Sequence, residues 1–219
     1  MLHYRKYQLF FMTSKIKEIF ILLMALVLTG AGCTGNISQA TIKNPQIGND
    51  DAPVEIVEYF DYQCSACKLA ESSIVPFLIE DYIENGEAKL VYKNFAFMGE
   101  VSRRAANAAL CAEEQGKFYN FHNKIFEVQG AEGASTYDSK FLKRVARDLG
   151  LDGSQFDSCL DSNKYQSQIL SDIDEARASK INSTPTYVIN GEKVSGAGSY
   201  LSIKRIVDRK LMDLGVVQK

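Results

Sequence analysis

Apolar and polar residues repeat along this chain with two periods, which divide it into predicted strands and helices. Val54–Phe60 is mostly β-branched and aromatic, which is typical of a central strand. A helix with a broad apolar face follows and ends at Asn85 and Gly86, and Pro76 inside it should kink it by removing a backbone donor. Ala88–Phe95 is a second strand. The order strand, helix, strand predicts a parallel pair with a right-handed crossover.

From residue 101 to residue 180 the apolar positions follow the helical period. Apolar stripes and terminal glycines predict five helices, which are Arg103–Gln115, one through Phe118–Phe126, one through Phe141–Leu149, Ser154–Asp161 and Lys164–Ser179. Strand signals return at Thr186–Ile189 and Glu192–Ser195, joined by the hairpin signal Asn190 and Gly191. Leu201–Leu214 is a last helix. The predicted α/β fold is therefore βαβ, a helical insertion at about 98–180, then ββα.

Residues 1–32 have the pattern of an export signal. Lys15 and Lys17 precede the apolar run Ile19–Leu28, and three small residues follow at 30–32. The apolar run is about half as long as a membrane-spanning helix, so it would hold the chain in a membrane only if it stayed uncleaved. Met12 begins a compact signal of ordinary length, and we predict that translation starts there.

Cys33 closes this segment, and Leu28–Cys33 resembles a bacterial lipoprotein processing site, where the cysteine becomes lipid-modified. Gly30 stands where such sites usually have a branched residue, so ordinary cleavage nearby is the alternative. Residues 33–50 are polar without periodicity and predict a short tether to a domain at 51–219. We expect the protein in the cell envelope or periplasm, tethered to the membrane by a lipid anchor or an uncleaved signal.

The composition limits the possible partners. The chain has 219 residues, a formal net charge of -2 and 24% charged residues, so it has no basic surface for a nucleic acid. Its length suits one ordinary domain plus a targeting segment, and we expect a monomer.

Five cysteines are present, and without Cys33 an even set of four remains in a compartment where disulfides persist. Cys64 and Cys67 form the most local of the possible pairs, which leaves Cys111 to form a structural disulfide with Cys159. A buried free thiol is the alternative for each of these last two.

The Cys64 and Cys67 pair lies where the first strand passes into its helix. The first sulfur of such a pair lies at the helix N-terminus, where unpaired N–H groups and the macrodipole favour a thiolate. Cys67, one turn further, can attack a mixed disulfide formed at Cys64. Cys64 is the predicted nucleophile and Cys67 the resolving cysteine. Half of a zinc site has the same spacing, so a non-enzymatic zinc-binding or structural lipoprotein is the alternative from another class.

Three segments resemble the thioredoxin superfamily, specifically its DsbA-like branch with a helical insertion: Glu58–Cys67, Leu110–Phe118 and Ser183–Tyr187. The resemblance covers about residue 51 to the C-terminus. It implies a thioredoxin-like fold and a thiol–disulfide oxidoreductase that needs no cofactor and no metal. It also implies that Pro185 is cis and packs against the cysteine pair, and that the Thr184 backbone pairs with an extended substrate. Glu58 would be a buried acid that relays the proton of Cys67, and an outward-facing Glu58 is the alternative.

The resemblance further implies that the substrates are exported proteins with thiols and that a membrane redox partner resets the pair. Ser65 and Ala66, between the cysteines, match neither the histidine of strongly oxidising motifs nor the Gly-Pro of reducing ones. A reductase or disulfide isomerase is therefore the alternative to an oxidase. His122 lies on an apolar helix face and is predicted to be packed rather than a ligand. Lys68 either adds positive charge beside the thiolate or faces solvent.

Overall fold

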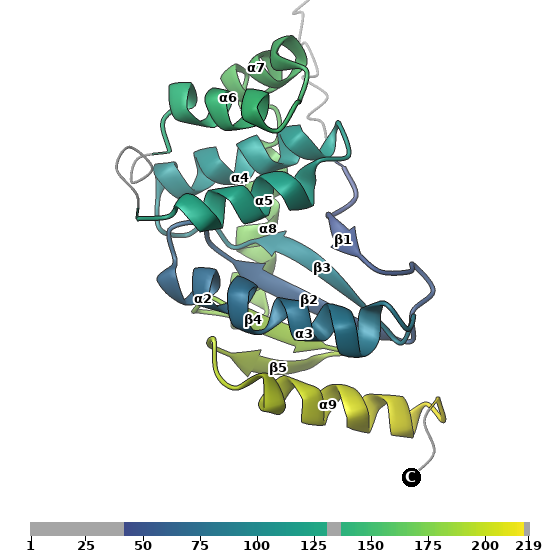
Figure 1. Cartoon of the computed structure of the whole chain (residues 1–219). Helices are drawn as coiled ribbons and strands as arrows, with labels where there is room; N and C mark the ends of the chain where they lie inside the picture. The colour runs from purple at the N-terminus through teal and green to yellow at the C-terminus, as the bar shows by residue number, and fades with distance from the viewer. Residues whose placement is uncertain (1–41, 131–136, 217–219) are drawn as a thin grey trace, which may run out of the picture. The chain divides into compact units, whose positions relative to one another are not determined.

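The computed structural model of the chain describes residues 42–130 and 137–216 (Figure 1). These residues belong to one unit, residues 39–219. The predicted signal peptide, the start at Met12 and the lipidation site at Cys33 lie outside the described residues. No helix of the described ranges is long and apolar enough to cross a membrane.

A five-stranded sheet forms the centre, in the order β1-β3-β2-β4-β5. The strands are β1 (Gln46–Ile47), β2 (Val54–Phe60), β3 (Ala88–Asn94), β4 (Thr186–Ile189) and β5 (Glu192–Ser195). Strands β2 and β3 are parallel, as the strand–helix–strand pattern predicts, and the other neighbours are antiparallel. The predicted α/β order of a parallel strand–helix–strand unit, a helical insertion and a C-terminal hairpin with a helix is thereby confirmed.

Successive side chains of β2 point to opposite faces of the sheet, and the two faces have different surroundings. Ile56, Glu58 and Phe60 are fully buried on one face, which the helix after β2 covers. Tyr59 points to the other face, where its hydroxyl donates a 2.8 Å hydrogen bond to Glu175. Because successive side chains of a strand point to opposite faces, β2 carries apolar residues on both sides and suits the middle of the sheet.

The helices surround this sheet (Figure 1). Their bounds are α2 (Ser65–Ser73), α3 (Val75–Leu78), the π-helix η1 (Ile79–Ile83), α4 (Glu100–Glu113), α5 (Phe118–Val128), α6 (Ser139–Asp148), α7 (Gly153–Asp161), α8 (Gln166–Ala178) and α9 (Tyr200–Asp213). Helices α4 to α7 gather in one group, while α2 and α3 lie along the sheet. The predicted order of elements is confirmed, and most bounds differ from the predicted ones by one to three residues.

The helix after the cysteine pair breaks near Pro76, as predicted. Helix α2 ends at Ser73 and α3 begins at Val75, so Pro76 stands in the first turn of the second piece. A proline is tolerated there because the first turn of a helix has N–H groups without intrahelical partners. The break therefore precedes the proline by two residues.

The fold begins before residue 51, where the sequence places the end of the tether. Strand β1 pairs antiparallel with β3, with Gln46 opposite Val91. Gln168 of α8 accepts a hydrogen bond from the Ile42 N–H at 2.9 Å and donates one to the Ile42 carbonyl at 3.0 Å. These contacts attach residues 42–47 to the domain, and a strand of two residues is too short to show a period in the sequence.

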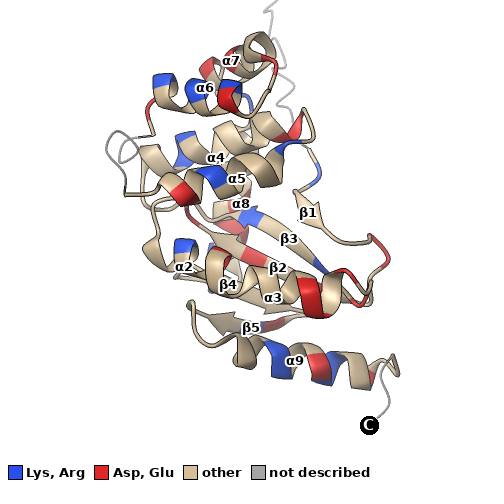
Figure 2. Ribbon diagram, in the orientation of Figure 1, with Lys and Arg blue, Asp and Glu red and all other residues tan. Residues whose placement is uncertain are grey.

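Charged residues of both signs are spread over the described helices and strands (Figure 2). Several form surface pairs, such as Arg104 with Glu100 and Lys143 with Asp161. Exposed pairs of this kind contribute little to stability, about 0–1 kcal/mol each.

A disulfide joins Cys111 of α4 to Cys159 of α7, across a sequence separation of 48 residues. Both residues are buried. The bond uses two of the four sulfurs that the zinc alternative would need, and it closes the helical insertion on itself.

Replacing both Cys111 and Cys159 by alanine is expected to lower the free energy of unfolding by about 2–4 kcal/mol, because the bond restricts the unfolded chain. Urea denaturation in a buffer without reductant measures the change. The exposed Ser158→Ala on the same helix is the control and should keep the wild-type midpoint. An unchanged midpoint in the double variant would contradict a stabilising role for this bond.

Candidate active site at Cys64 and Cys67

Cys64 is the residue immediately before α2, with extended backbone angles (φ -79°, ψ 116°). It is half-buried, and it and Cys67 are free thiols. The Cys64 pKa is lowered from 9.0 to about 5, chiefly because the Cys67 thiol donates a hydrogen bond to the Cys64 sulfur. Thr184 and the N–H groups of Ala66 and Cys67 also stabilise the thiolate, and they outweigh the cost of its partial burial.

Cys67 is fully buried one turn into α2. Burial raises its pKa far above the ordinary value, and the hydrogen bond to Cys64 and the nearby Glu58 carboxyl raise it further. The two sulfurs therefore differ in protonation and in exposure to solvent. Cys64 is an accessible thiolate at neutral pH, whereas Cys67 is a protonated thiol that solvent does not reach.

The Thr184–Pro185 peptide bond is cis and precedes β4. The Thr184 carbonyl oxygen lies 3.3 Å from the Cys64 sulfur, which in its thiol form donates to it. Thr184 comes from a segment 120 residues away in sequence, so the fold brings the two predicted parts of the site together.

Glu58 points into the core and is fully buried, so it is not the outward-facing residue of the alternative interpretation. The Tyr187 hydroxyl donates a 3.2 Å hydrogen bond to its Oε1 atom. Burial raises the Glu58 pKa well above 4.5, and a second buried carboxyl, Glu71, raises it further. These surroundings favour the protonated form of Glu58.

Two side chains that the sequence does not single out hold the loop before Cys64. The Asp61 carboxylate accepts hydrogen bonds from the Gln63 N–H at 2.8 Å and the Met98 N–H at 3.1 Å. Gln129, at the end of α5, donates to the Cys64 carbonyl at 3.1 Å. An aspartate directly after the strand is a signal for the first contact. The second contact has no local signal, because its partners are 65 residues apart.

The sequence leaves the surroundings of Lys68 open and predicts that His122 is packed. The Lys68 ammonium donates hydrogen bonds to the carbonyls of Glu127 at 3.1 Å and Gln129 at 2.7 Å. It therefore ties α2 to the end of α5. His122 is fully buried, and the Tyr62 hydroxyl lies 2.9 Å from its Nδ1 atom. Burial lowers the His122 pKa to about 3, so the ring is neutral.

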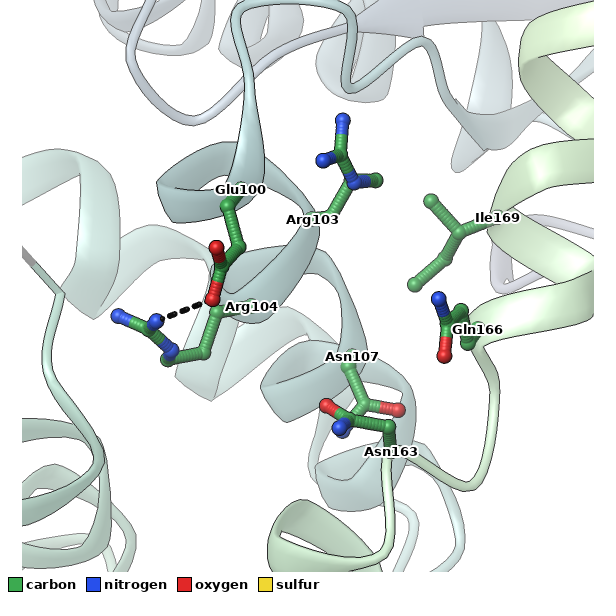
Figure 3. A pocket seen from close by; sticks show the side chains of 7 residues that line it. All are labelled: Glu100, Arg103, Arg104, Asn107, Asn163, Gln166 and Ile169. Atoms are coloured by element: carbon green, nitrogen blue, oxygen red, sulfur yellow. Dashed lines mark hydrogen bonds and ion pairs between the residues drawn. The ribbon is translucent and has the colours of Figure 1, made fainter.

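A separate cavity of about 250 Å³ lies between α4 and the first turns of α8 (Figure 3). Arg103 and Gln166 are among the residues that line it, and Glu100 pairs with Arg104 at 2.9 Å beside it. None of the predicted site residues lines this cavity. This cavity is therefore not part of the cysteine site.

Comparisons with known proteins agree on one fold. The profile of a family described as Thioredoxin matches residues 40–209. The chain is 32% identical over 177 residues to the disulfide bond formation protein D of Bacillus subtilis, covering 79% of this chain and 80% of that protein. It also resembles the crystal structure of oxidised BdbD from Bacillus subtilis, with a TM-score of 0.72, 31% identity and coverage of 77% and 93% of the two chains. For alpha-DsbA1 of Wolbachia pipientis the TM-score is 0.71 at 22% identity, with coverage of 81% and 95%.

Titrating the reduced protein by thiolate absorbance should give a midpoint near pH 5 for Cys64. Cys67→Ala should move this midpoint upward, because it removes the strongest hydrogen bond to the thiolate. Cys64→Ala is the control and should remove the transition. A wild-type midpoint near 9 would contradict the stabilised thiolate.

Because the pKa of Cys64 in the folded protein lies below its pKa in the unfolded chain, the reduced protein should gain stability from about pH 5 upward and have the full gain above about pH 9.

Proposed function

Because this chain belongs to the DsbA-like branch of the thioredoxin superfamily and is a thiol–disulfide oxidoreductase, we propose that it works as an oxidase. In this role its Cys64–Cys67 disulfide would be passed to thiols of exported proteins. The name of the Bacillus subtilis relative, disulfide bond formation protein D, supports that direction.

The observation that carries the proposal is the stabilised thiolate of Cys64. Interactions that favour this thiolate favour the reduced pair, because the thiolate exists only after the disulfide is broken. A pair whose reduced form is stabilised gives up its disulfide readily and is a strong oxidant. The Cys64 pKa of about 5 supports transfer of the disulfide to the substrate rather than its reduction.

The proposed steps follow from the different burial of the two sulfurs. A substrate thiolate attacks the Cys64 sulfur, the Cys64–Cys67 bond breaks, and its electron pair remains on Cys67, which takes a proton from Glu58. A second substrate thiolate attacks the substrate sulfur of this mixed disulfide. The substrate is then oxidised by two electrons, and Cys64 leaves as a thiolate.

We propose that Thr184 and Pro185 bind the substrate chain beside Cys64. The Thr184 backbone lies against the Cys64 sulfur, so an extended substrate that pairs with it would present its own sulfur to Cys64. A membrane redox partner would accept the two electrons and restore the disulfide. In that step Cys67, deprotonated by Glu58, attacks the mixed disulfide between Cys64 and the partner.

We further propose that the chain is exported and acts as a monomer in the cell envelope or periplasm. The charged and apolar pattern of residues 1–32 supports export. Lipid attachment at Cys33 would tether the domain, and an uncleaved signal would do the same.

The reduction potential of the Cys64–Cys67 pair tests the direction. Equilibration with glutathione should give a value well above the roughly -270 mV of thioredoxin and towards the roughly -120 mV of DsbA. The wild type should oxidise a reduced test protein, and Cys64→Ala should not. A potential near that of thioredoxin would instead favour the reductase or isomerase.

Metabolic labelling with a fatty-acid probe tests the anchor at Cys33. The full chain should be labelled in a bacterial host, and Cys33→Ala should lose the label because it removes the acceptor sulfur. Asn36→Ala, close by in the same segment, should keep it. Equal labelling of the Cys33 variant and the wild type would rule out this anchor.

A further inference from the structure

A cluster of buried polar groups lies behind Cys67, between the sheet and helices α2 and α5. It contains two carboxyl groups, Glu58 of β2 and Glu71 of α2. Around them lie the neutral ring of His122 and the hydroxyls of three tyrosines, which are Tyr62, Tyr92 and Tyr187. Within the described ranges, no lysine or arginine forms an ion pair with either carboxyl group. Only Glu58 has a role in the proposed steps.

The two carboxyl groups lie within hydrogen-bonding reach of each other. As two carboxylates they would have no hydrogen to share, and Glu58 Oε2 and both Glu71 oxygens would be buried without a partner. A proton on one carboxyl group supplies this hydrogen bond. Since unpaired buried polar atoms are costly, the geometry favours a pair that holds at least one proton.

His122 does not neutralise this pair with a positive charge. Its Nε2 atom lies 3.0 Å from Glu71 Oε1, but without the alignment of a hydrogen bond. Burial keeps the ring neutral, and burial also raises the Glu71 pKa. The groups that face Glu71 are therefore an acid, a neutral imidazole and tyrosine hydroxyls. The hydrogen bond with Glu58 favours the Glu71 carboxylate, but burial outweighs it and raises the Glu71 pKa to about 8.

Glu71 also reaches towards the surface. It lines a pocket between α2 and α5 together with Lys68, Ser72, Asn123, Phe126 and Glu127. Its side chain is only 6% exposed, and its carboxyl oxygens are covered. The carboxyl group of Glu71 thus lies beside Glu58. Other atoms of Glu71 line the surface pocket, which has a volume of about 260 Å³.

We propose that Glu71 is the second member of a two-carboxyl proton relay, which carries protons between Glu58 and solvent at the pocket between α2 and α5. This inference rests on the proposed role of Glu58. When a substrate breaks the Cys64–Cys67 bond, Cys67 takes a proton from Glu58. Glu58 takes one from Glu71, and Glu71 takes one from water at the pocket. The same path runs in reverse when Cys67 is deprotonated to resolve a mixed disulfide.

Resolution of a preformed mixed disulfide between Cys64 and glutathione tests the relay. The release of glutathione by Cys67 is followed in a stopped flow from pH 5 to pH 9. Glu58→Gln should slow the step about 100-fold, as expected when a general base is lost. Glu71→Gln should slow it about tenfold and remove one ionisation from the pH profile. The double variant should be no slower than Glu58→Gln, because Glu71 acts through Glu58.

Glu127→Gln is the matched control, since Glu127 lines the same pocket but its side chain is 67% exposed. It should keep the wild-type rate and profile. If Glu58→Gln slows resolution while Glu71→Gln retains the wild-type rate and profile, the relay is wrong and the role of Glu58 stands. If Glu58→Gln is also unaffected, both are wrong. Additive effects in the double variant would likewise overturn the relay.

Infrared spectroscopy of the reduced protein gives a readout that does not depend on activity. The wild type at neutral pH should show the carbonyl band of a protonated carboxylic acid, and the band should change in Glu71→Gln and in Glu58→Gln. Glu127→Gln should leave it unchanged. Absence of this band from the wild type would contradict a proton shared by the pair. An unchanged band in a folded Glu71→Gln variant would contradict it too.

Discussion

The pairing of β2 with β3 on one side and β4 on the other determines where each part of the site lies. In the register with β4, Glu58 stands opposite Tyr187 and Tyr59 opposite Thr186. Continued by one residue, this register brings Pro185 to the end of β2, where the chain enters the loop before Cys64. The parallel pairing with β3 ends at the same edge, so the Met98 N–H reaches Asp61. One strand thus aligns the acid, the loop and the Thr184–Pro185 segment.

The electrostatics of the site form a gradient from the surface to the core. Donors around Cys64 stabilise a negative charge at the N-terminus of α2. Three residues further, Cys67 lies where burial makes any charge costly, and burial raises the pKa values of Glu58 and Glu71 beyond it for the same reason. In the function that we propose, the first position favours the departure of a thiolate, and the inner positions supply the proton that its partner sulfur needs.

Most of the fold is predictable from the sequence because it rests on long periodic segments. Strand β2 and helix α6 show this well, and the spacing of Cys64 and Cys67 is itself local. Strand β1 is missed because two residues are too few to show an alternation of apolar and polar positions. Helix α4 begins at Glu100 rather than Arg103, after Gly99 with its positive φ of 117°. Glu71 and Gln129 are missed since their roles depend on partners that only the folded chain brings near.

The attachment of Ile42 to Gln168 also has a mechanical meaning. Force applied along the N-terminal segment would first load the two hydrogen bonds between Ile42 and the Gln168 side chain of α8. It would then load the short β1–β3 pairing. Both contacts lie before β2 in the path of the chain. Tension would therefore detach β1 from the edge of the sheet before it strained β2, and the spacing of the two sulfurs would not change when the N-terminal segment moves.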